Sequence, residues 1–488
     1  MQRILMGLSV IGVLLVTLIV VLFVNYARYQ LPPAPEGLPE VTVADVDADA
    51  IATRLSAALQ FKTISNADYT AVDYAPYDAF LAWLEVTYPG VHATMEREFI
   101  NRTPIYRWPG ADPALPPVLF TAHYDVVPVP DAALPNWEAD PWAGEIKDGY
   151  IWGRGALDDK QSVIGLLEAA EAMIAAGGTP ARDIWFVFGE DEEVGGALGA
   201  VAVTEALEAR GQRFAWMLDE GSMIFDDVLP GLSAPVASIN VAEKGYVTLA
   251  ITATGQAGHS SLPPSETAVG ILARAITAVE DNPLPGGLTD VSGAFFDSFA
   301  PGFGFVNRML FANQWLFQPV LESELSNAAT TNALLRTTTA PTMLVASPQE
   351  NVLASEATAT VNFRIHPRDT IESIVAHIEG VIDDPRVRVE PQGWAIEASP
   401  VSSEEAQGFK LIRAATEAVY GDVIVAPGLT VAATDARNYG RLADDAYRFL
   451  PLLFGPDDVP RLHGDNERVG VSEMAQMVQA YRAIFEGL

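Results

Sequence analysis

From about residue 45 onward, short apolar runs alternate with stretches in which apolar residues recur at helical spacing. This alternation is typical of an α/β sheet. Three of the runs predict buried strands that end at acidic or imidazole side chains: 118–120 before His123, 184–188 before Glu190 to Glu193, and 214–218 before Asp219. In open α/β sheets the edge where strands end carries the functional site, so we expect these polar side chains to converge there.

A helix is predicted between the first two strands, and the pair Gly177-Gly178 ends it. Its apolar positions are Val163, Ile164, Leu166, Leu167, Ala170 and Ile174. Near residue 243 the pattern changes to strands at 247–253, 358–365 and 387–389 with helices around 268–279 and 371–382. We therefore predict an inserted α+β domain over 243–397, between two parts of a catalytic domain at 45–242 and 398–488.

The N-terminus has a different character. Residues 4–24 form an unbroken apolar run of 21 residues, which is long enough to cross a bilayer as a helix. We predict a membrane anchor over 4–24, a proline-rich linker over 25–44, and a catalytic body outside the cytoplasm, whether periplasmic, extracellular or lumenal. The alternative is a signal peptide that is cleaved near Ala27. Arg3 and Arg28 flank the run, so the distribution of charge only weakly favours a cytoplasmic N-terminus.

Composition narrows the chemistry. A chain of 488 residues favours more than one domain. Its 29 basic and 63 acidic residues give a net charge of −34, which argues against a nucleic-acid partner. The chain has no cysteine. Thiolate nucleophiles and cysteine-based zinc sites are therefore excluded, and any metal must be held by His, Asp and Glu.

The candidate chemical residues are acids and imidazoles at the strand ends and in two further polar motifs. Each one alone is more often a solvated acid or a buried core histidine, but together they can meet at one edge. Two hard cations need a shared carboxylate, further carboxylates and imidazoles. One of two adjacent glutamates can bind metal while the other acts as a general base. The set comprises His123, Asp125, Asp158, Glu192, Glu193, Asp219 and His463.

The motifs around these residues resemble the di-zinc exopeptidase family of carboxypeptidase S, aminoacylase-1 and glutamate carboxypeptidase. Within it, the chain is most similar to the N-fatty-acyl-amino acid synthase/hydrolase branch, from about residue 50 to the end. The matching stretches are His123-Tyr124-Asp125-Val126-Val127-Pro128, the run 153–160, Asp191-Glu192-Glu193, Asp219-Glu220-Gly221, Gly258-His259-Ser260-Ser261, Asn332-Ala333 with Arg336-Thr337-Thr338, and Asn362-Phe363-Arg364-Ile365-His366-Pro367.

The resemblance implies a mixed-sheet catalytic domain with a smaller inserted α+β lid or dimerisation domain. It implies that Asp158 bridges two zinc ions, that His123 and Asp219 complete one site, and that Glu193 and His463 complete the other. Cobalt or manganese could substitute at such nitrogen and oxygen ligands. The remaining implied roles are Asp125 behind His123, Glu192 as general base, His259 polarising the scissile carbonyl (often across a homodimer), Arg364 clamping the substrate carboxylate, and Asn332 as an auxiliary donor.

One aromatic segment bears on the substrate. Eight aromatic side chains crowd 295–317: Phe295, Phe296, Phe299, Phe303, Phe305, Phe311, Trp315 and Phe317. We predict a loop-like insertion here, serving as an apolar groove for an acyl chain or as a face on the membrane. The alternative is that these residues only add core to the inserted domain.

The function expected from the sequence is zinc-dependent hydrolysis of the amide bond of an N-acyl amino acid with a free carboxylate, a class that includes fatty-acylated amino acids. The alternative enzyme is a dipeptide or small-peptide carboxypeptidase that uses the same site. A catalytically silent receptor that binds an amino-acid-like ligand is a third reading. The intact Glu192 argues against that receptor, because a binder needs no base beside its metals.

Overall fold

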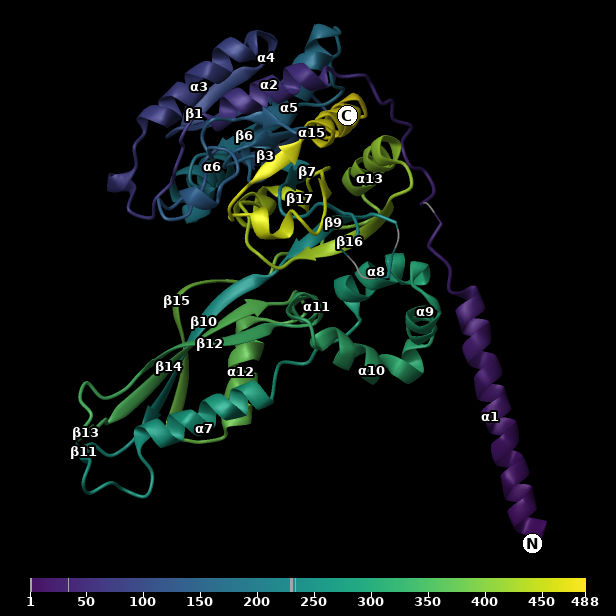
Figure 1. Cartoon of the computed structure of the whole chain (residues 1–488), viewed down its shortest axis with the longest axis vertical. Coiled ribbons are helices and arrows are strands. Elements are labelled where there is room, and N and C mark those ends of the chain that lie inside the picture. Colours follow the sequence, from purple (N-terminus) through teal and green to yellow (C-terminus); the bar gives the residue numbers. More distant parts are fainter. Residues whose placement is uncertain (1, 34, 229–230, 233) are drawn as a thin grey trace.

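The computed structural model describes residues 2–33, 35–228, 231–232 and 234–488. Figure 1 shows two lobes joined through the strands β9 and β10, with the helix α1 projecting from one side. The upper lobe contains the beginning and the end of the folded chain, and the lower lobe contains its middle. This arrangement gives a mixed α/β fold.

The upper lobe is built on a mixed sheet in which β6, β3, β7 and β17 are parallel neighbours. On either side of these four strands the sheet becomes antiparallel, as in the pairs β1 with β2 and β17 with β9. The strands run in the order β1 (Glu96–Ile100), β2 (Thr103–Trp108), β6 (Ile184–Gly189), β3 (Val118–His123), β7 (Phe214–Asp219), β17 (Ala443–Arg448), β9 (Val236–Glu243), β8 (Ile224–Phe225) and β18 (Leu453–Phe454), and β16 (Ile424–Thr430) pairs with β9. The three predicted strands are confirmed as β3, β6 and β7.

Helices cover both faces of this sheet because neighbouring strand residues point in opposite directions. Phe120 belongs to the core formed with α2 (Ala48–Leu59), α3 (Ala75–Thr87), α5 (Lys160–Ala175), α13 (Gln407–Tyr420) and α15 (Val471–Glu486). Leu119 belongs to the core on the other face, with α6 (Ala202–Ala209) and α14 (Ala436–Tyr439). The short helix α4 (Pro89–Thr94) packs against α5, and a small sheet joins β4 (Ile146–Lys147), β5 (Tyr150–Trp152) and β19 (Arg468–Gly470).

The lower lobe has its own antiparallel sheet and its own core. Only Lys244 separates β9 of the first sheet from β10 of the second. The second sheet runs in the order β12 (Thr338–Val345), β14 (Glu356–Ile365), β10 (Gly245–Thr254) and β15 (Val387–Ile396). The helices α7 (Ala268–Asp281) and α12 (Ile371–Ile382) bury their apolar sides against it. A short pair, β11 (Gly258–His259) and β13 (Val352–Leu353), forms the far tip of this lobe (Figure 1).

The aromatic segment is helical, so the prediction of a loop-like insertion is wrong. It forms α8 (Asp290–Phe299), α9 (Phe305–Phe311) and α10 (Gln314–Ser326), followed by α11 (Ala329–Leu335). Phe295, Phe296, Phe299 and Phe311 are buried in one core together with Ala426 of β16. The helices therefore pack partly on the edge of the upper sheet. The interlocking aromatic rings supply enough buried apolar area to hold a helical layer that turn signals alone do not reveal.

The first helix, α1 (Gln2–Arg28), stands apart from both lobes (Figure 1). Its stretch Met6–Arg28 has a mean hydropathy of 3.0, and none of that window is buried. Length and composition allow this helix to cross a membrane, and a signal sequence would pass the same test.

Candidate active site

The site lies where parallel strands of the upper sheet end. His123 is the last residue of β3, and its register partner on β6 is Gly189. Just beyond β6, a short turn at Glu192–Val194 presents two glutamates, and β7 ends next to Glu220. Because these strands are adjacent and parallel, their ends bring the side chains to the same edge of the sheet.

Asp158 lies at the centre and divides its two carboxylate oxygens between two groups. Its Oδ1 is 2.9 Å from Nε2 of His123, which is also 3.4 Å from Oε1 of Glu220. Its Oδ2 is 2.9 Å from Nε2 of His463, which is also 3.2 Å from Oε2 of Glu193. These are two ligand triads that share one carboxylate, as a pair of closely spaced cations requires.

The loop that presents Asp158 is held by Glu467, a residue whose importance sequence reasoning missed. One oxygen of Glu467 accepts hydrogen bonds from the backbone N–H groups of Gly155 at 3.0 Å, Leu157 at 2.7 Å and Asp158 at 3.2 Å. Its other oxygen pairs with Arg154, which also donates to the backbone carbonyls of His463 and Gly464. One buried ion pair therefore ties the Asp158 loop to the His463 loop.

Asp125 lies behind His123 and also under the glutamate turn. Nδ1 of His123 is 3.0 Å from the backbone carbonyl oxygen of Asp125 and 3.2 Å from its carboxylate. The carboxylate of Asp125 accepts the backbone N–H of Glu192 at 3.1 Å and that of Glu193 at 3.2 Å. A carboxylate behind an imidazole ligand fixes the orientation of that imidazole. Here the Asp125 carboxylate also positions both glutamates.

Glu220 occupies the place that the sequence assigned to Asp219, and this corrects the predicted set. Asp219, the last residue of β7, accepts a hydrogen bond from the Thr121 hydroxyl at 2.7 Å and lies outside both triads. Consecutive residues at a strand end point to opposite sides, so the two carboxylates cannot both face His123. The motif Asp219-Glu220-Gly221 contained the right residue one position later.

The cluster holds more buried negative charge than its surroundings neutralise. Burial, together with the charge of Asp158, raises the pKa of Glu220 to about 8. Burial also raises the pKa of Glu193, and Oε1 of Glu193 is buried without a hydrogen-bond partner. Burial opposes ionisation of Asp158, yet hydrogen bonds from His123 and His463 hold its pKa below the ordinary aspartate value. Bound cations would supply the missing positive charge, so these residues fit a metal pair.

A cavity of about 250 Å³ opens beside the triads and has both a polar and an apolar part. Asp158, Glu192, Glu193, Glu220 and His463 line one part of it. The rest of the wall is largely apolar, with side chains of Leu157, Met223, Phe225, Leu450, Phe454 and Leu462. Burial, then the charge of Asp435, raises the pKa of Glu192 well above the ordinary glutamate value.

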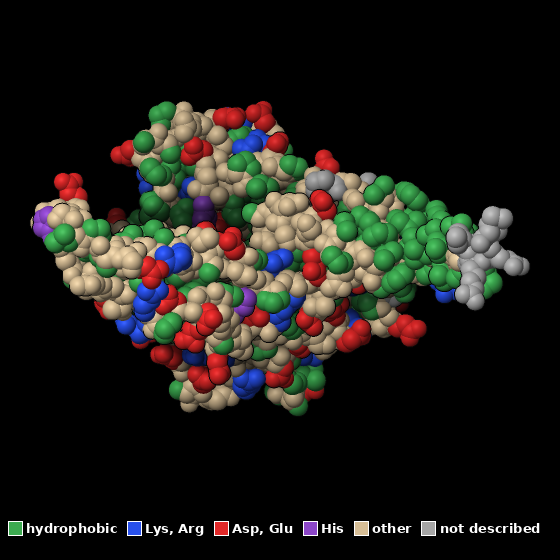
Figure 2. Space-filling view, turned by 90° about the horizontal axis from the view of Figure 1, so that it is seen from below, with side chains coloured by type: hydrophobic (Ala, Val, Ile, Leu, Met, Phe, Trp, Pro, Cys, Tyr) green, Lys and Arg blue, Asp and Glu red, His purple; other side chains and the backbone are tan. Residues whose placement is uncertain are grey.

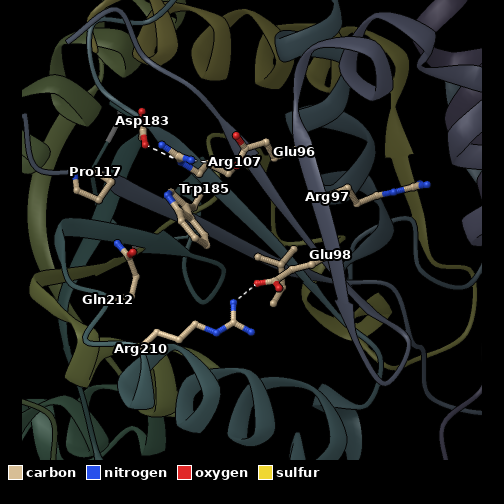
Figure 3. Close-up of a pocket in the computed structure, with 10 residues that line it drawn as sticks. Glu96, Arg97, Glu98, Arg107, Pro117, Asp183, Trp185, Arg210 and Gln212 are labelled. Atoms are coloured by element: carbon tan, nitrogen blue, oxygen red, sulfur yellow. Dashed lines mark hydrogen bonds and ion pairs between the residues drawn. The ribbon is translucent and has the colours of Figure 1, made fainter. Parts of the chain in front are cut away.

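A larger cavity, of about 550 Å³, lies along β1, β2 and β6 and is separate from this chemistry. Figure 3 shows Arg107 directed at Asp183, at 2.8 Å, and Arg210 directed at Glu98. Arg107 also pairs with Glu96. The charged groups that line this larger cavity thus neutralise one another. Its lining residues form no cluster comparable to the two triads.

Three further candidate residues lie on the lower lobe, within the predicted inserted domain, and none of them lines the cavity beside the triads. His259 is exposed at the tip on β11, where its Nδ1 lies 2.8 Å from the Ser261 hydroxyl. Arg364 is on β14, with its guanidinium 5.0 Å from the centre of the Tyr246 ring. Asn332 is on α11. Within the described residues of a single chain, the structure therefore brings together the metal-ligand candidates and Glu192, and keeps these three apart from them.

Comparison with known proteins finds relatives that match most of this chain. A relative from Dictyostelium discoideum named "Probable carboxypeptidase S-like 2" is 39% identical, over 90% of this chain and 85% of its own length. The Xenopus tropicalis protein named "N-fatty-acyl-amino acid synthase/hydrolase PM20D1" is 35% identical, over 97% of this chain and 94% of its own length.

Solved structures have the same fold at low sequence identity. An M20 family metallo-carboxypeptidase from Sulfolobus solfataricus superposes with a TM-score of 0.59 at 16% identity, covering 89% of this chain and 98% of its own. Human carnosine dipeptidase 1 gives a TM-score of 0.57 at 16% identity, covering 90% and 96%. The peptidase family M20/M25/M40 matches residues 119–487. On this evidence the chain belongs to peptidase family M20/M25/M40 and is a hydrolase.

Proposed function

We propose that this protein is a two-zinc hydrolase that cleaves the amide bond of N-acyl amino acids, including fatty-acylated ones. The observation that carries the proposal is the division of the two Asp158 oxygens between His123 and His463. His123, Asp158 and Glu220 would hold one metal, and Asp158, Glu193 and His463 the other. Cobalt or manganese would also suit these nitrogen and oxygen ligands.

When bound, the metal pair supplies Lewis acidity toward the substrate carbonyl and makes a water molecule more acidic. Glu192 then takes the proton of the attacking water and delivers it to the leaving amine. Its raised pKa suits a group that must accept a proton and release it again. Asp125 orients His123 and holds the turn that carries Glu192, so the base and the ligands keep a fixed relation.

Substrate recognition would involve both lobes. The planar guanidinium of Arg364 suits a substrate carboxylate, which it can bind through two parallel hydrogen bonds. Asn332 would donate a further hydrogen bond, and His259 would polarise the scissile carbonyl. The apolar wall beside the triads would receive the acyl chain.

His259 lies at the far tip of the lower lobe, so we propose that it serves the site of a second copy in a homodimer. The edge strand β12 supports such pairing, since Met343, Leu344 and Val345 are each at least 60% exposed. The neighbouring helix α7 adds Val269, which is 51% exposed. An apolar sheet edge of this kind can pair with another chain.

The name of the Dictyostelium relative favours a second candidate, a carboxypeptidase that acts on dipeptides or small peptides. That enzyme would use the same metals and the same base. The two functions differ in which part of the substrate lies against the apolar wall of the cavity, on the acyl side of the scissile bond. A substrate panel separates them.

We also propose that α1 anchors the protein in a membrane, with the two lobes outside the cytoplasm. Its length and apolar composition support this arrangement. An amphiphilic acyl amino acid is a fitting substrate for an enzyme held at a lipid surface.

The test is hydrolysis of N-acyl amino acids with acyl chains from acetyl to oleoyl, measured beside dipeptides. We expect kcat/KM to rise with chain length. Leu462→Ser, which removes apolar surface from the cavity wall, should lower kcat/KM for long chains more than for acetyl. Val459→Ser, at an exposed neighbour outside that wall, is the matched control. Faster cleavage of dipeptides, with no dependence on acyl length, would favour the carboxypeptidase.

A further inference from the structure

The helices α9 and α10 present an apolar face that stays largely exposed in the described part of the chain. Phe305 is 53% exposed, Val306 67%, Trp315 62% and Val320 47%, and Leu316 is also exposed. We call these five residues the α9–α10 face. On the other side of α10, Leu321 is buried in the aromatic core. The helix thus carries one apolar side for packing and another that points to solvent, which typically marks an interaction site.

This face is continuous with α1. The ring of Phe305 lies 5.2 Å from that of Tyr26 and 6.3 Å from that of Phe23, measured between centroids. The side-chain amide of Asn313 donates to the backbone carbonyl of Leu22 at 3.2 Å and accepts from Asn25 at 2.9 Å. The contacts fall where the apolar run of α1 ends, so α9 and α10 begin at the level where α1 would leave the hydrocarbon.

Arg308 fixes the position of α1 against α9. Its guanidinium donates to the backbone carbonyls of Tyr26 at 3.3 Å and Tyr29 at 2.6 Å, and it lies 4.6 Å from the centre of the Tyr26 ring. The last carbonyls of a helix have no partner within the helix, and a cation there satisfies them. The Tyr29 hydroxyl donates to Asp297 of α8 at 2.8 Å. The end of α1 is therefore held by several directed contacts.

We propose that the α9–α10 face lies in the interfacial layer of the same bilayer that α1 enters, so that the chain contacts the membrane at two places. This inference rests on the proposed anchoring by α1. Tyr26, Tyr29 and Trp315 are the aromatic types that gather at membrane interfaces. The net charge of −34 offers no general attraction to anionic lipids, so apolar contact drives the docking and zwitterionic lipids suffice.

The shape of the molecule sets a condition on this placement. In Figure 1, α1 extends in the direction in which the lower lobe also extends, and α10 runs across beside it. Figure 2 shows the molecule from below, with the green apolar surface of α1 beside the two lobes. The lower lobe can therefore lie along the lipid surface only if α1 is tilted well beyond the average of about 20° for membrane-spanning helices.

The absence of cysteine makes the experiment direct, because each introduced cysteine is the only one in the chain. The full chain is placed in phosphatidylcholine vesicles that contain nitroxide-labelled lipid. A fluorophore is attached at Val306→Cys or Trp315→Cys on the face, at Leu14→Cys in α1, or at Val86→Cys. Val86 is an 81% exposed residue of α3 in the upper lobe, remote from α1 (Figure 1), and serves as the control.

We expect the labels at 306, 315 and 14 to lose fluorescence to the lipid quencher, while the label at 86 keeps it. Loss at 14 without loss at 306 and 315 would overturn the second contact and leave the anchor standing. Loss at 306 and 315 without loss at 14 would support the docking and overturn the anchor. Labels at 306 and 315 that stay bright but respond to protein concentration would show a second copy of the chain on this face, which also overturns the proposal.

Discussion

A single carboxylate organises the candidate site. Asp158 faces His123 with one oxygen and His463 with the other, so the two triads cannot be altered independently at this position. The neighbouring Glu192 lines the same cavity but lies outside both triads. This separation of the ligands from the base makes their roles distinguishable by substitution.

Glu192→Gln should keep the fold and both metals while it removes most of the turnover. The change deletes a proton acceptor and leaves every ligand in place, and the loss of a general base typically lowers the rate by about 10² to 10⁴. Metal content and kcat of the purified variant are the measurements. Turnover near that of the wild type would remove Glu192 from its proposed role.

Glu220 and Asp219 provide a matched pair. Glu220→Gln should leave the His123 triad short of one carboxylate and lower the metal content, because an uncharged amide is a much weaker ligand for zinc. Asp219→Asn should retain both metals, since its amide oxygen can still accept the Thr121 hydroxyl. Metal analysis after mild chelation compares the two. The opposite ranking would restore Asp219 as the ligand.

Arg364→Ala should weaken catalysis on N-acyl amino acids if Arg364 clamps the substrate carboxylate. The lost charge-assisted contact is worth roughly 1.5–3 kcal/mol, or about 10- to 150-fold in kcat/KM. The loss should largely vanish for a substrate whose carboxylate is amidated, and Arg364→Lys should recover only part of it. Equal losses on the acid and the amide would instead point to the packing of Arg364 on Tyr246.

At the scale of single residues, the sequence predicted that acids and imidazoles meet at the site, but it did not always predict which acid. His123, Asp158, Glu193 and His463 were predicted as ligands from the resemblance of their motifs to the exopeptidase family, and the structure brings them together. Glu220 was missed because the side-chain direction just past a strand depends on where that strand ends. Glu467 was missed because it acts through backbone N–H groups, which leave no pattern in the sequence.

At the scale of elements, the Arg154–Glu467 pair joins two loops that are far apart in sequence. Both side chains are almost fully buried, and Glu467 also holds the backbone before Asp158. The three predicted strands and the one predicted helix of the upper lobe are confirmed, because their apolar runs and helical spacing are clear. The aromatic segment was predicted as a loop, since its dense aromatic residues and interspersed glycines hide the helical spacing.

Glu467→Gln should lower the free energy of unfolding and reduce metal binding by the His463 triad. It leaves the guanidinium of Arg154 buried without a counter-charge, and breaking a buried pair in this way costs about 3–5 kcal/mol. Urea unfolding and metal titration measure the two effects. The double variant Arg154→Met with Glu467→Gln should recover part of the stability. If Glu467→Gln alone matches the wild type in both assays, the pair does not hold these loops.

At the scale of the whole molecule, the lower lobe carries His259 far from the triads of its own chain. Arg364 and Asn332 are also on this lobe: Arg364 pairs with Tyr246, close to the junction at Lys244, and Asn332 lies on α11. A catalytic role for His259 therefore requires a second copy of the chain or a large movement of the lobe. Mixing two inactive variants distinguishes these arrangements.

Chains carrying His259→Ala and chains carrying Glu192→Gln should each be nearly inactive alone. In a mixed dimer, one site combines an intact Glu192 with an intact His259 from the other copy, so about a quarter of all sites should regain activity after exchange of subunits. Activity before and after mixing, with the mass of the complex in solution, is the measurement. No recovery from a confirmed mixed dimer would show that His259 acts within its own chain or not at all.

The ligands of the site come from both ends of the folded chain. Four of them precede residue 221, whereas His463, and Glu467 that supports Asp158, lie in the final stretch before α15. During synthesis, His123, Asp158 and Glu220 are all made well before His463 and Glu467. Because metal binding to such a site is coupled to folding, we expect the nascent polypeptide to stay hydrolytically inert until its last segment has emerged and docked.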